Sequence, residues 1–156
     1  MMNSITVYDI HILETPIGKM IATANQEAIV SLSFIDKTLK VASKNPLLIR
    51  LEKELQEYFQ NKRIAFTLPL NPAGTIFQKN VWDTLLTIPY GATLSYANEA
   101  KRLGNPKAIR AVANANGKNP IAILIPCHRV ISTDGSLGGY NGGIEKKEFL
   151  LALEKQ

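Results

Sequence analysis

Apolar residues alternate with polar ones along the first part of the chain, and this pattern predicts three short strands. The strands span residues 5–13, 17–24 and 28–34, and Thr15-Pro16-Ile17-Gly18 forms the turn between the first two. A helix is predicted to begin at Pro46, because apolar residues then recur with helical spacing and can pack on the sheet. These residues are Leu47, Leu48, Leu51, Leu55, Tyr58 and Phe59. The acidic residues of this helix, which we interpret as a solvated face, are Glu52, Glu54 and Glu57.

A segment rich in proline and glycine, residues 67–74, separates this part from a second part that is mostly helical. We therefore predict two domains, residues 1–71 and 72–156. Thr75, followed three residues later by Gln78, predicts a capping box at the start of a helix. The expected core residues of that helix are Phe77, Val81, Trp82 and Leu85.

Two further helices are predicted close together. Ser95 can cap a helix over residues 96–103 that Gly104 ends, and Asn105 can cap the next helix, with Pro106 at its first position. Two short helices joined by such a turn are typical of a helix-turn-helix. Helix pairs of this kind also occur in proteins that bind no nucleic acid, so this motif alone leaves both interpretations open.

The second helix of this pair combines small and basic side chains. At about 100° per residue, three residues share a face suited to the core: Ile109, Val112 and Ala113. The opposite face carries Lys107, Arg110 and Asn114, and a strip of small residues between the faces consists of Ala108, Ala111 and Ala115. This surface fits a nucleic-acid groove, with alanines against the sugar edges and Arg110 reaching in. A closely packed helix–helix contact is the alternative.

The only cysteine, Cys127, follows five apolar residues and Pro126. A strand that ends at the proline would hold the thiol near the surface, and positive charge nearby favours the reactive thiolate. In an extended segment Cys127 and His128 point to opposite sides, which makes a direct hydrogen bond between them awkward but leaves a proton relay through one water open. The alternative is a buried cysteine that acts as a small hydrophobic residue. The other histidine, His11, is interpreted as an ordinary strand residue.

Residues 134–143 hold five of the ten glycines and can bring backbone amides close to a ligand. Tyr140, the aromatic residue of this loop, can close over a flat ligand or anchor the loop. A last helix, residues 145–154, is expected to bury Phe149, Leu150 and Leu153. Glu154 borders that face, where it can orient His128 or stay solvated.

Composition narrows the class of protein. The 156 residues are 46% hydrophobic and 20% charged, as in soluble globular proteins, and neither a membrane span nor a signal peptide is expected. One cysteine excludes an internal disulfide and a cysteine-based metal cluster, and a free thiol suits the cytoplasm. The net charge of +5 lies mostly in residues 72–156, which hold ten Lys or Arg and six Asp or Glu. That excess is compatible with a polyanionic partner, or serves only solubility.

The segment Ile123-Leu-Ile-Pro-Cys-His-Arg-Val130, with Gly117-Lys-Asn-Pro120 before it, resembles the active-site motif of the O6-alkylguanine-DNA alkyltransferases. The resemblance covers residues 74–156 almost without gaps, whereas the first part agrees only in outline with the ribonuclease-H-like domain of that family. Further matching segments are Thr75-Ile-Phe-Gln78, Ile88-Pro-Tyr-Gly91, Ser95-Tyr96, Gly104-Asn-Pro-Lys107, Arg110-Ala-Val112, Gly138 to Gly143 and Leu150-Leu-Ala-Leu-Glu154.

The resemblance implies an α+β protein, with a ribonuclease-H-like meander plus helix and a mostly helical domain that contains a winged helix-turn-helix. It implies direct-reversal repair: a monomer binds the minor groove of double-stranded DNA, flips out O6-methylguanine, or O4-methylthymine, and transfers the alkyl group irreversibly to its own cysteine. Flipping is needed because the thiol cannot reach the alkyl group inside the base stack. No metal or other cofactor is implied.

The resemblance also implies roles for individual residues. Cys127 accepts the alkyl group, His128 deprotonates it through a water, Glu154 orients His128, and Asn119 is the hinge between the recognition helix and the active site. Tyr96 assists flipping and polarises the purine, and Arg110 fills the space that the flipped base leaves. The other residues expected to contact DNA are Lys107, Ala108, Ala111 and Ser95. The residues expected to line the base pocket are Tyr140, Val130, Gly138, Gly139 and Asn141.

Two departures from the family pattern affect these expectations. Ala122 stands where human-like members have proline, close to the pocket entry, which bears on the size of the alkyl group accepted. Some members carry zinc in the N-terminal domain, and we expect none here because that part has no cysteine. A noncatalytic module that marks lesions for other repair proteins is an alternative, although such relatives have tryptophan in place of the cysteine. A cysteine hydrolase is a further alternative, which the lack of a second suitably placed histidine disfavours.

Overall fold

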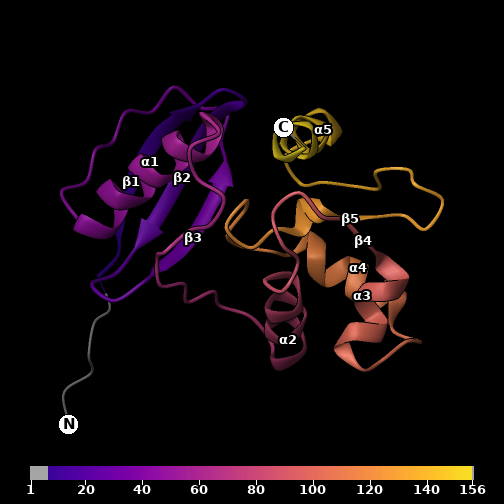
Figure 1. Cartoon of the computed structure of the whole chain (residues 1–156). Helices are drawn as coiled ribbons and strands as arrows, with labels where there is room; N and C mark the ends of the chain where they lie inside the picture. The colour runs from indigo at the N-terminus through magenta and orange to yellow at the C-terminus, as the bar shows by residue number, and fades with distance from the viewer. Residues whose placement is uncertain (1–6, 156) are drawn as a thin grey trace, which may run out of the picture. The chain divides into compact units, whose positions relative to one another are not determined.

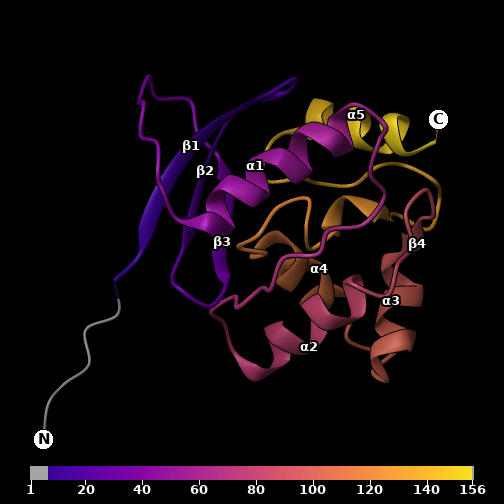
Figure 2. The same ribbon diagram turned by 60° about the vertical axis from the view of Figure 1, so that its left-hand side comes forward.

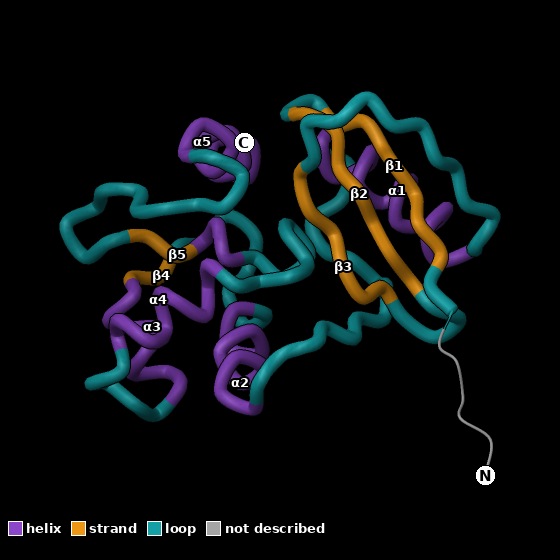
Figure 3. Tube along the Cα trace, turned by 180° about the vertical axis from the view of Figure 1, so that it is seen from behind, coloured by secondary structure: helices purple, strands orange, loops and turns teal. Residues whose placement is uncertain are grey.

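The first unit of the chain, Met1–Pro72, is a three-stranded antiparallel sheet with one helix packed on a face of it (Figure 1). The strands lie in the order β1-β2-β3, and Figure 3 shows the sheet from its other face, with the helix behind it. The elements are β1 (Asp9–Thr15), β2 (Gly18–Ala24), β3 (Ile29–Phe34) and α1 (Pro46–Phe59). The three strands, the turn and the helix are therefore confirmed, although the first strand begins at Asp9 and continues to Thr15 instead of ending at residue 13.

The computed structural model describes residues 7–155. Residues 1–4, in which we expected no signal peptide, and residues 5 and 6 of the first predicted strand lie outside this range. The core of the first unit forms where the inward side chains of the sheet meet the apolar stripe of α1. Its fully buried side chains include Met20, Ile29, Leu32, Leu48, Leu51 and Tyr58.

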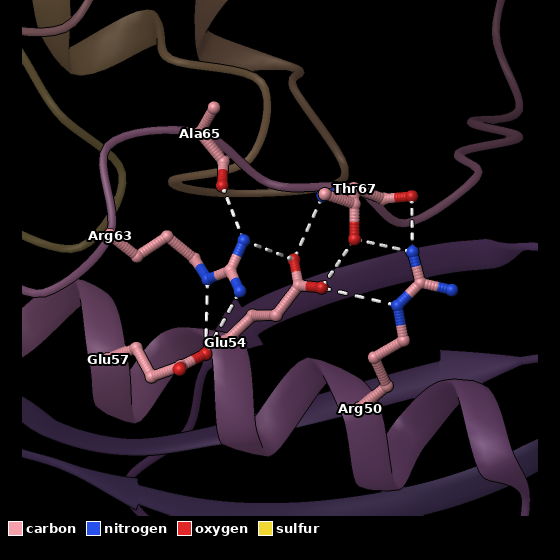
Figure 4. Close-up of polar contacts among 6 residues, drawn as sticks. All are labelled: Arg50, Glu54, Glu57, Arg63, Ala65 and Thr67. Atoms are coloured by element: carbon pink, nitrogen blue, oxygen red, sulfur yellow. Dashed lines mark hydrogen bonds and ion pairs between the residues drawn. The ribbon is translucent and has the colours of Figure 1, made fainter.

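The solvated face predicted for α1 is wrong at Glu54, which is only 3% exposed. Its carboxylate accepts hydrogen bonds from the Thr67 backbone N (2.9 Å) and Oγ1 (2.5 Å), as Figure 4 shows. Arg50 Nε lies 3.2 Å and Arg63 Nη1 3.7 Å from the carboxylate oxygens. Burial raises the pKa of Glu54, but the Thr67 hydrogen bonds and the two guanidinium groups outweigh it, so the pKa lies below its usual value. Helical spacing predicts the contact with Arg50, four residues before Glu54, but not those with Arg63 and Thr67, which come after the helix.

The second unit, Ala73–Gln156, is a cluster of helices with two short parallel strands (Figures 1 and 2). Its elements are α2 (Ile76–Leu85), β4 (Leu94–Ser95), α3 (Tyr96–Leu103), α4 (Ile109–Gly117), the 3₁₀ turn η1 (Cys127–Arg129), β5 (Val130–Ile131) and α5 (Ile144–Glu154). Helices α2, α3 and α4 pack on one another, and α3 with α4 forms the predicted helix-turn-helix. The whole chain is thus α+β, as expected.

The N-cap residues predicted for the second unit are confirmed at two of three helices. The capping box of Thr75 and Gln78 begins α2, and Ser95 Oγ accepts from Asn98 N (3.0 Å) at the start of α3. The third prediction is wrong, because α4 begins at Ile109. Asn105 lies four residues before Ile109, and the N-cap position of α4 is occupied by Ala108. The Asn105 N–H instead closes the end of α3 on the Ala100 carbonyl (2.9 Å), and its carbonyl accepts from Ala108 N (3.0 Å) in a separate turn.

Burial within the second unit also differs from the predicted pattern at single positions. Ile109 is 42% exposed, although Val112 behind it is buried. Helical spacing predicts which way a side chain points from the helix axis, but not how far the neighbouring elements cover it. Ile109 stands in the first turn of α4, where its side chain stays partly exposed. Ala115 does not lie in an exposed strip: it is buried, and its carbonyl accepts from Trp82 Nε1 (2.9 Å). Phe149, expected in the core, is 40% exposed.

Candidate active site

The segment that leads to Cys127 is a buried turn rather than the predicted strand. Ile125 N donates to the Ile121 carbonyl (3.0 Å), Ile123 has a φ of 71°, and residues 127–129 form a 3₁₀ turn. The apolar residues of the segment are buried in this turn: Ile121, Ile123, Leu124 and Ile125. A continuous apolar run indicates burial on all sides, and an extended backbone is only one way to achieve it.

The pairing of two short strands brings the start of α3 next to this turn. β4 and β5 run parallel, with Leu94 opposite Val130 and Ser95 opposite Ile131. Tyr96 follows β4 directly, and Cys127 lies three residues before the start of β5. Segments that are thirty residues apart in the chain therefore meet at the thiol.

Cys127 is half-buried and contacts Asn119. Asn119 Nδ2 lies 3.3 Å from Cys127 Sγ and donates to the Ile125 carbonyl (2.7 Å), while its Oδ1 accepts from Ile121 N (3.0 Å). One carboxamide thus holds both ends of the turn and the sulfur. Burial raises the pKa of the Cys127 thiol, although the Asn119 hydrogen bond and the Lys147 charge oppose it. The thiol is therefore protonated at rest.

His128 is fully buried next to the thiol. Its Nε2 lies 2.7 Å from Glu154 Oε2, and its Nδ1 has no hydrogen-bond partner among residues 7–155. Burial lowers the pKa of His128, and Glu154 only partly compensates. A neutral imidazole with its proton on Nε2, facing the carboxylate, presents the lone pair of Nδ1 as a base. No direct hydrogen bond joins His128 to Cys127 within the described range, which agrees with transfer through a water.

Arg129 completes this arrangement, in a role that was not predicted from the sequence. Its Nε and Nη2 donate to the two Glu154 oxygens (2.8 and 3.0 Å), and its Nη1 donates to the Ile88 carbonyl (2.8 Å). The guanidinium is buried and lies 5.9 Å from the centre of the Tyr90 ring. This bidentate pair fixes the carboxylate that orients His128. A charged residue directly after Cys127-His128 in an apolar stretch was the available signal.

The glycine loop lies against Tyr96. A Cβ at Gly138, whose φ is 72°, would be 2.7 Å from the Tyr96 hydroxyl, so only glycine allows this approach. Lys147, fully buried on α5, donates to the Gly139 carbonyl (3.2 Å) and lies 5.8 Å from the centre of the Tyr96 ring. Lys147 is a second residue that sequence reasoning missed. Its spacing from Leu150, Leu151 and Glu154 places it on the buried face of α5, but a lysine is rarely buried.

The tyrosines near the thiol are kept neutral. Burial, and after it the Cys127 charge, raises the pKa of both Tyr96 and Tyr140. Each phenol therefore keeps a proton that it can donate in a hydrogen bond. Two other predicted pocket residues serve the fold in addition: Val130 is fully buried in β5, and Asn141 Nδ2 donates to the Gly117 carbonyl. A role of these residues in a base pocket stays a prediction.

The residues expected to contact DNA lie around the start of α4. Lys107, Arg110 and Ala111 are exposed, and Ala108 is half-buried. Ser95 is half-buried and caps α3, so its side chain is already used within the fold. From α4 the chain reaches Cys127 through Asn119, which connects the exposed helix to the thiol segment.

Within residues 7–155, no three His, Cys, Asp or Glu side chains are grouped so that they could hold a metal ion. In the same range, every helix is too short or too polar to cross a membrane.

Comparison with known proteins identifies the family. Residues 76–156 match the family model described as 6-O-methylguanine DNA methyltransferase, DNA binding domain, and residues 7–72 match the ribonuclease-like domain of the same proteins. The methylated-DNA–protein-cysteine methyltransferase of Methanosarcina barkeri is 45% identical over 154 residues, which cover 95% of this chain and 96% of that one. A probable methylated-DNA–protein-cysteine methyltransferase of Acanthamoeba polyphaga mimivirus is 47% identical over 150 residues, 94% of this chain and 97% of that one. The crystal structure of Mycobacterium tuberculosis OGT in complex with DNA superposes with a TM-score of 0.86 at 40% identity, over 94% of this chain and 92% of that one. The chain therefore belongs to the 6-O-methylguanine DNA methyltransferase family.

Proposed function

We propose that this protein repairs O6-methylguanine in DNA by transferring the methyl group irreversibly to Cys127. The observation that carries the proposal is the arrangement at the thiol: Asn119 contacts Cys127 Sγ, and the neighbouring His128 bonds to a Glu154 that Arg129 holds. A nucleophile, a buried base and a group that orients the base are the parts that such a reaction requires.

The reaction proceeds with one proton transfer and one substitution. Nδ1 of His128 takes the thiol proton through a water, and Glu154 stabilises the imidazolium that forms. The thiolate attacks the methyl carbon, a sulfur–carbon bond forms, and the carbon–oxygen bond breaks with its electron pair on the guanine. A hydrogen bond from Tyr96 supports the leaving base, which becomes neutral guanine when it takes up a proton. The thioether product has no simple route back to a thiol, so each molecule acts once.

The thiol and the imidazole are both neutral at rest, because burial raises the pKa of Cys127 and lowers that of His128. Proton transfer between them is then unfavourable until a substrate consumes the thiolate. Alkyl transfer then draws on the small thiolate population that this equilibrium allows, and the alkyl carbon can meet the sulfur only after the base has left the duplex stack.

The second domain, residues 72–156, binds double-stranded DNA through the helix-turn-helix and carries the reaction, while residues 1–71 form the first domain. Helix α4 enters the minor groove with Ala108 and Ala111 against the sugar edges, and Lys107 and Ser95 near phosphates. Arg110 fills the space of the flipped base. The pocket for that base consists of Tyr140, Val130, Gly138, Gly139 and Asn141. The protein acts as a monomer in the cytoplasm, where its thiol stays reduced, and O4-methylthymine is a second substrate.

Stoichiometry tests the proposal. Duplex DNA with a radiolabelled methyl group on guanine O6 is incubated in excess with the protein. We expect transferred label to stop at one methyl group per protein molecule, and none to be transferred by Cys127→Ser. Continued turnover, or transfer by that variant, would refute the assignment, and a protein that binds the DNA without taking label would be a noncatalytic lesion binder.

A further inference from the structure

A buried carboxyl group that the proposed reaction does not use lies between the two helices of the helix-turn-helix. Glu99 on α3 is 0% exposed, and Asn116 near the end of α4 is 6% exposed. Asn116 Nδ2 donates to Glu99 Oε1 at 2.7 Å. The other oxygens of the two side chains, Glu99 Oε2 and Asn116 Oδ1, are buried without a hydrogen-bond partner among residues 7–155.

One proton satisfies both of these oxygens. An ionised carboxylate only accepts, so Oε2 and the amide oxygen would be two buried acceptors that face no donor, at a cost in free energy. A carboxyl group with its proton on Oε2 has the complementary donor for Asn116 Oδ1. Such a carboxyl group can donate from Oε2 while its Oε1 accepts from Asn116 Nδ2, so acid and amide can form a cyclic pair of hydrogen bonds.

We propose that Glu99 is a positioning residue that keeps its proton in the folded protein, and that the Glu99–Asn116 pair fixes α3 to the end of α4. Helices α3 and α4 pack together in Figure 2, and the pair lies between them. The inference rests on the proposed function, because the pair acts through the site. Tyr96 is three residues before Glu99, and Asn119, which contacts the Cys127 sulfur, is three residues after Asn116.

The electrostatic surroundings agree with a bound proton. Burial raises the pKa of Glu99 to about 7, and the Asn116 hydrogen bond opposes this only in part. Within the described range no Lys or Arg of α2, α4 or β5 forms an ion pair with Glu99. Ionised Glu99 interacts electrostatically with two titratable groups, Tyr96 on α3 and Cys127 on η1, and raises the pKa of both. Loss of the proton would therefore disfavour the thiolate as well as the helix pair.

The sign of the pH dependence follows from the raised pKa. The unfolded chain releases the proton near the usual value of 4.5, whereas the folded protein keeps it to about 7. The contribution of this proton to the free energy of unfolding is fully present below the pKa of Glu99 in the unfolded chain. It is lost as the pH rises through the pKa of Glu99 in the folded protein. Between pH 5 and pH 8 the folding equilibrium should fall on the order of 100-fold for this reason alone.

The test compares the wild type with Glu99→Gln, which keeps the shape and supplies a permanent donor, and with Glu148→Gln, an exposed change on α5. Urea unfolding is measured for the three full-length proteins from pH 5 to pH 8. We expect Glu99→Gln to gain stability relative to the wild type as the pH rises, on the order of 100-fold in the folding equilibrium, and Glu148→Gln to follow the wild type. Parallel pH profiles for all three proteins would overturn the bound proton.

The positioning role has its own readouts. Glu99→Ala should slow methyl transfer roughly tenfold or more, and Glu99→Gln should restore the rate. The apparent pKa of Cys127, measured with a small thiol reagent, should be lower in Glu99→Gln than in the wild type, because the variant lacks the Glu99 charge that raises it. An unchanged transfer rate in Glu99→Ala would overturn the positioning role. If the wild type itself transfers no methyl group, the proposed function fails, while the unfolding comparison still decides whether Glu99 holds its proton.

Discussion

Replacing Glu154 by glutamine should disable the base while the thiol and the fold persist. The two carboxylate oxygens accept three hydrogen bonds, from His128 Nε2 (2.7 Å), Arg129 Nε (2.8 Å) and Arg129 Nη2 (3.0 Å). An amide has one acceptor oxygen, and its NH₂ group must then face one of these donors. If it faces His128, the imidazole moves its proton to Nδ1 and loses the lone pair that takes the thiol proton.

Both effects have a magnitude. General-base catalysis contributes about 10²- to 10⁴-fold, so methyl transfer by Glu154→Gln should slow by about that factor. Removal of one partner from a buried ion pair costs about 3–5 kcal/mol, because Arg129 keeps an uncompensated charge. The free energy of unfolding should fall by a similar amount.

Single-turnover transfer from O6-methylguanine duplex, measured at a temperature at which urea unfolding shows the variant to be folded, separates the two effects. Glu148→Gln, an exposed change on the same helix, is the control and should keep the wild-type rate. Transfer by folded Glu154→Gln at the wild-type rate would refute the assignment of His128 as the base that Glu154 orients.

Two further predictions concern the DNA surface and the first unit. Arg110→Ala should slow repair in intact duplex roughly tenfold or more beyond any loss of rate on a base that is already unpaired, because the cost of flipping the base, a few kcal/mol, is then uncompensated. Single-turnover rates on both substrates test this prediction, and equal losses of rate would contradict the role of Arg110. Glu54→Gln should reduce the free energy of unfolding by about 3 kcal/mol at neutral pH. The pKa of Glu54 in the folded protein lies below its usual value of 4.5. This stabilisation is therefore present above the pKa of Glu54 in the unfolded chain, and it is lost as the pH falls through the pKa in the folded protein. A urea-unfolding difference that does not shrink in acid would show that the charge of Glu54 is not its source.

Local signals in the sequence predicted much of the fold. The Thr75–Gln78 capping box, the Ser95 cap and Gly104 at φ 92° act within one turn of helix, so the residues that determine them are neighbours in the chain. The start of α4 was predicted wrongly, because a local signal does not show which of two neighbouring turns the residue belongs to. Asn105 is a residue type that often caps helices, but a separate turn follows it and Ala108 takes the N-cap position of α4.

The parts of the site that were missed depend on partners distant in sequence. Arg129 meets Glu154 twenty-five residues later, and Glu99 meets Asn116 seventeen residues later. Neither pair follows from helical spacing, because each joins different elements. The turn before Cys127 could not be distinguished from a strand, since an apolar run indicates burial whichever backbone path achieves it.

The central claim is that the Cys127 sulfur takes the methyl group from guanine. The direct measurement is the mass of the Cys127 peptide, digested from the protein after incubation with a duplex that contains O6-methylguanine. We expect that peptide alone to gain the mass of one CH₂ group, with the guanine restored in the DNA. A Cys127 peptide of unchanged mass, from protein shown to have bound the lesion, would contradict the account.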